Sequence, residues 1–332
     1  MRGLSKKILQ FIKNSDDNVA VILRGVIKDI RGENKNQFFF GIRDNSIEIY
    51  CMGARVIKIN FNDSGDVTNC MTNVKYIDAD FVGKSKDVII PYNQIDDCYF
   101  CDLLERVKNY TTKEKNSETI ERQYQQQIML ANNDSINTEW YCLDMEYNTG
   151  EYGKLDIVTI SKKENNDGKY EVIIVELKVD YDAMNGDSGI YSHFVKFDKF
   201  LKNSKDSTSF KESIVNILFN KIELGLCNEQ LKNLYQKFTV DDLEEPKVVF
   251  LTYCFNNIMA SNKKSFKNKV FEKDRRVKKT IKGFLTIENR SIEEFPENMY
   301  RCIFKEGDPN GPIFSDIEIS EAKNIFDEEA YK

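Results

Sequence analysis

The chain has 332 residues, 41% of them hydrophobic, so it can bury a sizeable core and is expected to divide into two compact units. No run approaches the roughly 18 apolar residues of a membrane span, and the opening segment 1–13 has no secretory signal, so we expect a cytoplasmic protein with no membrane partner. The net charge of −6 argues against a protein that coats nucleic acid by bulk attraction, so any such site must be local.

The first part of the chain, residues 1–110, is expected to be a strand-rich domain of unknown role. An amphipathic helix at 1–13 is followed by short β-branched and aromatic runs that predict strands. These runs are residues 19–30, 37–42, 46–52 and 55–61. A mixed stretch, 87–110, leads into the charged segment TTKEKNSE, where we place the boundary to a second domain, 111–332.

The second domain begins with a predicted helix at 117–133, for which Ser117 is a natural N-cap. Three strand patterns follow, and the turn sequence NNDG predicts a hairpin between the last two. The remaining elements are two helices, one more strand and a closing amphipathic helix. The order α-β-β-β-α-α-β predicts an α/β core, a mixed sheet flanked by helices. The ranges are 139–147, 155–161 and 170–179 for the three strands, 190–201 and 210–226 for the two helices, 247–255 for the last strand and 315–332 for the closing helix.

One strand carries two charges where a buried strand would normally be apolar. Period two places Glu176 and Lys178 on one face of the strand 170–179. Burying an ionised group costs several kcal/mol unless it is paired or meets a metal. The hairpin brings Asp156 opposite or nearly opposite Glu176, with Cβ atoms roughly 5 Å apart. Two carboxylates on one patch of sheet form a ready magnesium site, and Lys178 could stabilise phosphate charge or position a metal-activated water.

The segments GKLDIV (153–158) and IVELKV (174–179) resemble the D-x(n)-E-x-K signature of the PD-(D/E)XK, or restriction-endonuclease-like, nucleases. The resemblance covers residues from about 118 to 255, and it includes the order of the elements. It implies a restriction-endonuclease-like core in which Asp156 and Glu176 bind the metal and Lys178 is the catalytic lysine. Leu155 stands where the family's eponymous pattern has proline. The family also uses an acidic residue of the first helix as a ligand, directly or through water; Glu121 is the first choice here and Glu118 the second.

The resemblance implies a Mg²⁺- or Mn²⁺-dependent deoxyribonuclease that acts as an endonuclease in bacterial defence, restriction or repair. Many members of the fold dimerise to cut two strands, so a homodimer is the default expectation. A catalytically silent nuclease-like module that binds nucleic acid or a protein partner is the alternative. The sequence does not distinguish DNA from RNA, endonuclease from exonuclease action, or one recognition sequence from another.

Each proposed site residue also has a structural interpretation. Glu176 and Lys178 could form a local ion pair or face water at a sheet edge, and Asp156 could be solvated beside Lys154. Glu121 could serve only as a partner of the helix dipole, as acidic residues near helix N-termini usually do. On the preceding strand, two further acids, Asp144 and Glu146, are expected to be solvated more often than metal-bound.

Basic residues supply a candidate DNA interface. On the helix after the E-x-K strand, Lys196 is the candidate phosphate contact, whereas His193 is interpreted as a partly buried polar residue. The segment 263–282 carries ten lysines and arginines, and a solvated lysine-rich segment is its alternative interpretation. The candidate contacts within it are Lys263, Lys264, Lys267, Arg275 and Arg276.

The cysteines favour a reducing compartment. Eight are scattered along the chain without the spacing of a disulfide framework. Cys98 and Cys101 form one CxxC pair, but a structural zinc site needs about four ligands and His193 is the only histidine. A zinc site at this pair is the less favoured alternative to reduced thiols.

Overall fold

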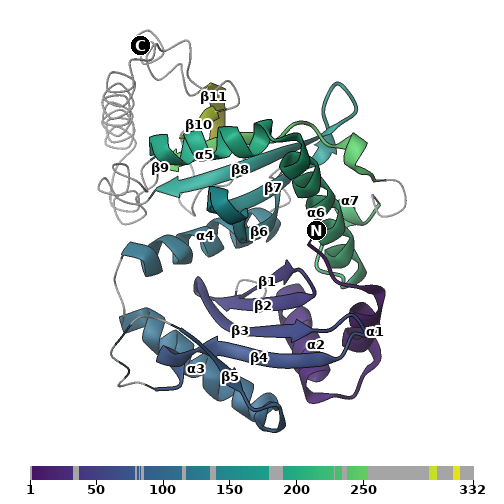
Figure 1. The fold of residues 1–332 in the computed structure, drawn as a ribbon, viewed down its shortest axis with the longest axis vertical. Coiled ribbons are helices and arrows are strands. Elements are labelled where there is room, and N and C mark those ends of the chain that lie inside the picture. The colour runs from purple at the N-terminus through teal and green to yellow at the C-terminus, as the bar shows by residue number, and fades with distance from the viewer. Residues whose placement is uncertain are drawn as a thin grey trace. The chain divides into compact units, whose positions relative to one another are not determined.

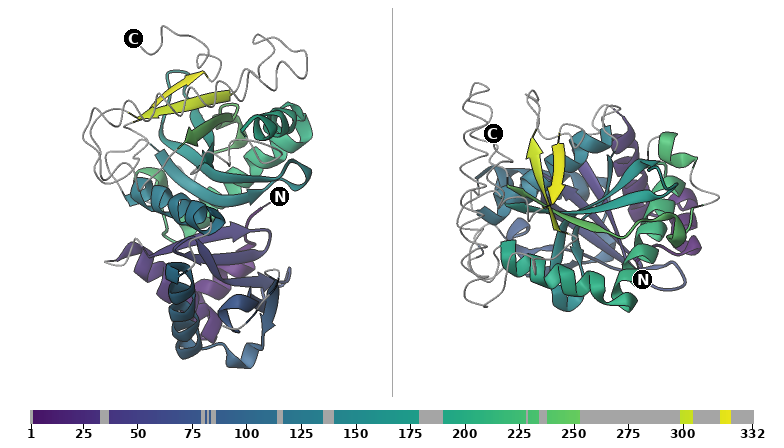
Figure 2. Two further views of the ribbon diagram at one scale, coloured as in Figure 1. Left: turned by 90° about the vertical axis from the view of Figure 1, so that its left-hand side faces the viewer. Right: turned by 90° about the horizontal axis from the view of Figure 1, so that it is seen from above.

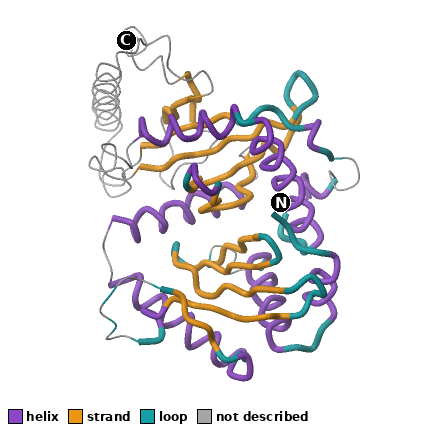
Figure 3. The backbone as a smooth tube through the Cα atoms, in the orientation of Figure 1, coloured by secondary structure: helices purple, strands orange, loops and turns teal. Residues whose placement is uncertain are grey.

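The computed structural model divides into two compact units, each with its own sheet (Figures 1 and 3). Unit 1 consists of Met1–Asp134 and Ser209–Val240, and unit 2 of Ser135–Thr208 and Asp241–Lys332. The two units are interleaved along the chain, and residue 110, after which a linear division was expected, lies within the helix α3. The residues described are 2–32, 37–78, 81, 83, 86–113, 117–134, 140–178, 190–227, 229–233, 238–252, 299–304 and 317–321.

Unit 1 contains a five-stranded antiparallel sheet in the simple order β1-β2-β3-β4-β5. Two helices, α2 and α3, contact one another and the sheet, and α1 packs on α2. The strands are β1 (Phe38–Arg43), β2 (Ser46–Cys51), β3 (Ala54–Phe61), β4 (Val67–Asn73) and β5 (Asp87–Ile90). The helices are α1 (Lys6–Asn14), α2 (Asn18–Arg31), α3 (Asp97–Lys113), α4 (Ser117–Asp134), α7 (Glu229–Lys232) and the part of α6 (Ser204–Glu223) from Ser209 onward, with 3-10 turns at η1 (Val74–Tyr76) and η2 (Tyr92–Gln94).

The expected strand at 19–30 is wrong, because these residues form α2. Its buried apolar residues recur at helical spacings of three and four, as Val19, Ile22, Leu23, Val26 and Ile27 do. The side chain of the N-cap residue Asp17 accepts a hydrogen bond from the backbone N of Val19 at 2.8 Å. The β-branched composition suggested a strand, whereas the periodicity and the cap determine the helix. The helix expected at 1–13 and the strands expected at 37–42, 46–52 and 55–61 are confirmed as α1, β1, β2 and β3.

Unit 2 contains a six-stranded mixed sheet in the order β11-β10-β9-β8-β7-β6. Strands β6, β7 and β8 form an antiparallel meander. Strand β9 pairs parallel with both β8 and β10, and β11 closes the sheet antiparallel to β10. The strands are β6 (Trp140–Asn148), β7 (Lys154–Glu164), β8 (Tyr170–Lys178), β9 (Lys247–Thr252), β10 (Met299–Phe304) and β11 (Ile317–Glu321), joined by α5 (Ile190–Lys202) and the 3-10 turns η3 (Gly150–Tyr152) and η6 (Val240–Asp242).

The expected α/β class with a mixed sheet is confirmed, as is the chain order of α4, β6, β7, β8, α5, α6 and β9. Two strands beyond β9 were not expected, and Figure 2 shows β10 and β11, in yellow, extending the sheet. The closing helix expected at 315–332 is wrong for residues 317–321, which form β11. Among the described helices, none is long and apolar enough to cross a membrane.

Candidate functional site

The candidate site is built on the hairpin of β7 and β8. Its turn is closed by Asn165, whose backbone N donates to the Lys169 carbonyl at 2.8 Å and whose Oδ1 accepts from the backbone N of Asp167 and Lys169, each at 3.0 Å. Gly168 takes the positive φ of +74° that the turn requires. The NNDG sequence therefore forms the predicted hairpin.

The register of this hairpin brings the two predicted carboxylates to adjacent positions. Ile157 is paired with Val175, and Val158 with Ile174. One step further along the same register, Asp156 lies opposite Glu176, and paired residues in antiparallel strands direct their side chains to the same face of the sheet. The predicted pairing of the strands is therefore confirmed, and both carboxylates belong to one patch of the sheet of unit 2.

Both carboxylates are buried in spite of their charge. Asp156 is 7% exposed and Glu176 is 0% exposed. The Oδ2 atom of Asp156 accepts a hydrogen bond from the backbone N of Leu177 at 2.7 Å, so this carboxylate is fixed against the strand that carries Glu176. Neither residue is the solvated strand-edge acid of the structural interpretation. A buried pair of this kind costs several kcal/mol of desolvation unless cations or polar donors compensate it.

One residue at the site was not predicted to belong there. His193, on α5, places its Nδ1 atom 2.6 Å from Oε1 of Glu176. The imidazole side chain is 21% exposed and also makes an edge-to-face contact with Phe197, with ring centroids 5.6 Å apart. The interpretation of His193 as a partly buried polar residue is correct for its exposure, but it missed this partner. The available signal was its position on the helix that directly follows the E-x-K strand.

Lys178 is the third member of the predicted triplet. Its backbone lies on β8, where it pairs with Thr252 of β9, and Glu176 pairs with Phe250 of the same strand. Lys178 lies two positions after Glu176, so both belong to one face of β8. The Lys178 side chain lies outside the part of the chain that the structure describes.

The acids of β6 differ from the expectation of solvated strand-end residues. Asp144 is fully buried, and its Oδ1 accepts from the backbone N of Met145 at 2.9 Å. A register irregularity between Cys142 and Asp144 precedes this residue, whereas the pairing of β6 with β7 is continuous from Asp144 to Asn148. Glu146 has a positive φ of +53° and forms an ion pair with Lys154 at 2.9 Å.

The other predicted residues lie outside the β7–β8 hairpin. Glu121 lies on α4, which belongs to unit 1, so its proposed role at the hairpin stays a prediction. Lys196 is exposed on α5, as a phosphate contact would need to be. Cys98 and Cys101 are exposed free cysteines on α3. The predicted DNA contacts at Lys263, Lys264, Lys267, Arg275 and Arg276 lie outside the described residues.

Two carboxylates are a sufficient protein contribution for some divalent cations but not for others. Within the described ranges, no group of three or more His, Cys, Asp and Glu side chains is arranged to hold a metal ion. Structural zinc needs about four such ligands. Mg²⁺ keeps several waters and is commonly held by one or two carboxylates together with substrate phosphates. The all-oxygen pair Asp156 and Glu176 therefore fits Mg²⁺ or Mn²⁺ in its donor chemistry.

Comparison with known proteins finds no match to this chain among protein-family models, curated proteins or solved structures.

Proposed function

We propose that this protein is a Mg²⁺- or Mn²⁺-dependent nuclease, similar to the PD-(D/E)XK family, that hydrolyses phosphodiester bonds of DNA as an endonuclease. One observation carries the proposal: the β7–β8 register puts Asp156 opposite a fully buried Glu176, with Lys178 two residues further on β8. The order of elements from α4 to β9 supports the same assignment. A role in defence, restriction or repair and a homodimeric state belong to the proposal only through the resemblance.

In the proposed site, Asp156 and Glu176 would hold the metal. The hydrogen bond from Leu177 to Asp156 fixes the orientation of that carboxylate, and the burial of Glu176 excludes bulk water from its side of the patch. The metal, when bound, would make a coordinated water more acidic and neutralise charge on the phosphate. Lys178 would donate to the attacking water or to the phosphate oxygens, where negative charge develops.

Three further residues would complete the proposed site. His193 would orient Glu176 through the Nδ1 contact, in the way that residues behind a metal ligand commonly set its direction. Glu121 would add an acidic ligand, directly or through water. Lys196, exposed on the helix that carries His193, would contact a phosphate of the substrate.

The proposal is tested by cleavage of linear, circular and single-stranded DNA, with RNA in parallel, in Mg²⁺ or Mn²⁺. Asp156→Asn and Glu176→Gln keep the side-chain volumes and remove the charge, so each should lower the cleavage rate by about 100-fold or more, and Lys178→Ala should do the same. Glu164→Gln is the matched control, because Glu164 is an exposed acid at the far end of β7. Cutting that persists in both carboxylate variants would contradict the assignment.

One observation favours the second candidate, a silent module that binds nucleic acid or a protein. The contact of His193 with Glu176 supplies the buried carboxylate with a partner from within the protein. Thermal unfolding with and without Mg²⁺ or Mn²⁺ distinguishes the two. A stabilisation by metal that is lost in Asp156→Asn supports the nuclease, whereas nucleic-acid binding with neither metal stabilisation nor cleavage supports the silent module.

A further inference from the structure

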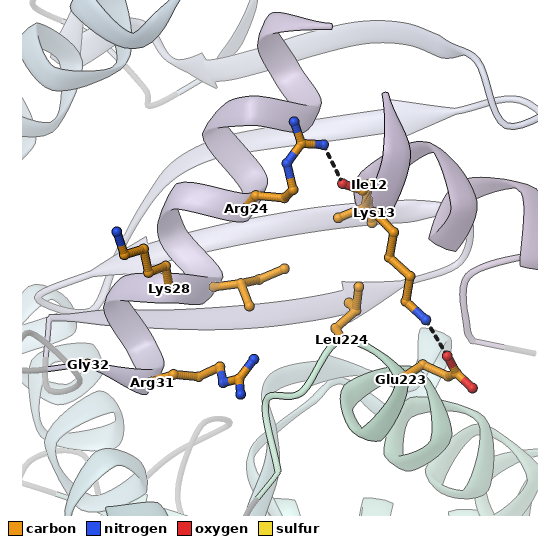
Figure 4. Close-up of a pocket in the computed structure, with 9 residues that line it drawn as sticks. Ile12, Lys13, Arg24, Lys28, Arg31, Gly32, Glu223 and Leu224 are labelled. Carbon is orange, nitrogen blue, oxygen red and sulfur yellow. Dashed lines mark hydrogen bonds and ion pairs between the residues drawn. The ribbon is translucent and has the colours of Figure 1, made fainter. Parts of the chain in front are cut away.

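Unit 1 contains a cavity that the proposed nuclease site does not use. Its volume is about 560 Å³, and it opens where α1, α2 and the turn after α6 meet (Figure 4). Sites for small molecules typically enclose about 300–1,000 Å³. All of its lining residues belong to unit 1, which contains neither Asp156 nor Glu176. The cavity is therefore of the right size for a small ligand of its own.

The floor of the cavity is apolar. Ile12 from α1, Ile27 from α2 and Leu224 from the turn after α6 line it, and each of these residues is at least nine-tenths buried. The turn is fixed by hydrogen bonds from the backbone N of Leu224 to the Asn220 carbonyl and from the backbone N of Gly225 to the Ile222 carbonyl. This floor can accept a flat apolar group.

The rim is cationic in a chain whose net charge is −6. Arg24, Lys28 and Arg31 recur along α2 at spacings of four and three, so they share one side of the helix. Lys13 and Glu223 complete the charged lining. Four cations and one acid leave an excess of three positive charges around the opening. That excess is suited to an anion.

Two of the cations are already used by the protein. The Arg24 guanidinium donates to the carbonyls of Ile12 and Ser15 at 2.8 and 2.7 Å. Lys13 forms an ion pair with Glu223, as Figure 4 shows. These contacts fix the wall of the cavity, and they also neutralise the one acid in its lining.

The other two cations remain for a ligand. Neither the Lys28 nor the Arg31 side chain forms a hydrogen bond or ion pair with a residue that the structure describes. Figure 4 shows Arg31 extending from the end of α2 toward Leu224. A Cβ atom on Gly225 would lie 2.9 Å from Nη1 of Arg31, so the guanidinium rests against this glycine. That contact places Arg31 beside the turn after α6, and both Arg31 and Lys28 are exposed.

We infer that this cavity binds a phosphate ester with a flat apolar body, of the class of nucleoside monophosphates. The planar fork of Arg31 can donate two hydrogen bonds to a phosphate, and Lys28 adds a second charge one turn earlier. The nucleobase of such a ligand would lie against the side chains of Ile27 and Leu224. Neutralisation of the helix dipole accounts for cations in the last turn of α2, but it does not account for the apolar cavity between them.

The test uses calorimetric titration of the full chain with the four nucleoside 5′-monophosphates, adenosine and inorganic phosphate. At least one monophosphate should bind about tenfold or more tightly than adenosine or phosphate alone, because only the ester uses both floor and rim. The double variant Lys28→Ala/Arg31→Ala should weaken this binding by about tenfold or more. Arg106→Ala is the control, because Arg106 is an exposed arginine on α3 of the same unit and lies outside the cavity lining.

The inference is overturned if no monophosphate binds at millimolar concentration, or if the double variant binds as tightly as the wild type. Equal weakening by Arg106→Ala would also overturn it, since it would show attraction by general charge rather than by this cavity. The readout is independent of the proposed nuclease activity, because binding should persist in Glu176→Gln. Loss of cleavage and loss of nucleotide binding are therefore separate results.

Discussion

At the scale of single residues, the position of His193 beside Glu176 gives a prediction, although the 2.6 Å approach of Nδ1 to Oε1 does not have the geometry of a hydrogen bond. If Glu176 binds the metal as proposed, His193→Ala should weaken the affinity for Mn²⁺ by about tenfold or more, because the carboxylate loses the group that directs it. His193→Asn should recover part of the loss, since its amide can donate from near the Nδ1 position. Ser192→Ala, the neighbouring change on α5, is the control.

The readout for His193 is the Mn²⁺ concentration that gives half-maximal cleavage, measured beside the thermal stability without metal. A merely structural residue would lower stability in the absence of metal and leave the half-maximal concentration unchanged. That pattern would show that His193 fills space beside Phe197 and does not orient Glu176.

A second buried carboxylate, Glu48 of β2, serves stability. Its Oε2 accepts from Nε of Arg43 at 2.9 Å and from the Tyr50 hydroxyl at 2.8 Å, and its Oε1 accepts from Nη1 of Arg55 at 3.0 Å. Burial raises the pKa of Glu48, but the two guanidinium charges and the hydrogen bonds from Tyr50 and Arg55 outweigh burial and lower the pKa to about 2. The carboxylate is therefore held in its charged form.

The lowered pKa of Glu48 predicts an acid-dependent loss of stability. Its contribution is fully present above the unfolded-state pKa, near 4.5, and is lost as the pH falls from there toward 2. The shift corresponds to roughly 3 kcal/mol. Glu48→Gln should therefore lower the free energy of unfolding at pH 7 and have a smaller effect near pH 3. Denaturation followed by far-UV circular dichroism measures this free energy. Tryptophan fluorescence is unsuitable, because Glu48 lies in unit 1 and the only tryptophan, Trp140, lies in unit 2. A difference in unfolding free energy between the wild type and Glu48→Gln that does not change with pH would contradict the prediction.

The candidate site could be predicted from the sequence where local rules determine the geometry. The NNDG turn joins β7 to β8, and a register shift between Ile160 and Glu164 then brings Asp156 opposite Glu176. The turn is a local signal, whereas the shift is not, so the sequence alone predicts only that the two carboxylates lie opposite or nearly opposite. His193 could not be assigned in the same way. It belongs to α5, and the position of that helix on the sheet depends on tertiary packing that no local pattern encodes. The burial of Asp144 also escaped prediction; the irregularity between Cys142 and Asp144 directly precedes this residue, and no local pattern signals it.

At the scale of elements, α2 shows why composition alone misleads. Residues 19–30 are rich in valine and isoleucine, which favour strands, yet their apolar positions follow the helical period and Asp17 caps the start. The strands β10 and β11 were missed for the opposite reason. Their segments lie far from β9 in the sequence, and β10 becomes a strand by pairing parallel with β9.

The tight turn between β2 and β3 gives a prediction at this scale. Met52 and Gly53 have φ values of +51° and +75°, and a Cβ atom on Gly53 would lie 2.3 Å from the carbonyl carbon of Arg122 on α4. Gly53→Ala should therefore cost about 3 kcal/mol or more, from the strained φ and the clash with backbone together. Gly168→Ala is the control, because Gly168 has a similar φ of +74° with nothing within 4 Å of the added Cβ.

The Gly168 variant should cost only about 1 kcal/mol, the conformational part alone. Urea denaturation of both variants measures the difference. Equal losses would mean that α4 moves away from the turn at little cost, and the hydrogen bond from the Gly53 backbone N to the Gln126 side chain should then also be dispensable for stability.

At the scale of the whole molecule, the interleaved units bear on how the chain can be divided. Unit 1 includes the segment Ser209–Val240, although this segment lies far from Met1–Asp134 in the sequence. The backbone N of Leu4 donates to Oδ1 of Asn220 at 2.7 Å, and the Asn220 amide donates to the Leu4 carbonyl at 3.3 Å. The amino group of Lys221 lies 4.3 Å from the centre of the Phe39 ring. A fragment that ends at residue 110 lacks all of these partners.

We therefore expect residues 1–110, expressed alone, to unfold without a cooperative transition, because Leu4, just before α1, and Phe39 of β1 lose their contacts with α6. A fusion of Met1–Asp134 to Ser209–Val240 through a long Gly/Ser linker should melt cooperatively, since a long flexible linker adds only a small loop-closure cost. Far-UV circular dichroism on heating compares the two. Cooperative melting of 1–110 would favour the linear division after residue 110, because the strand-rich segment would then hold its own core.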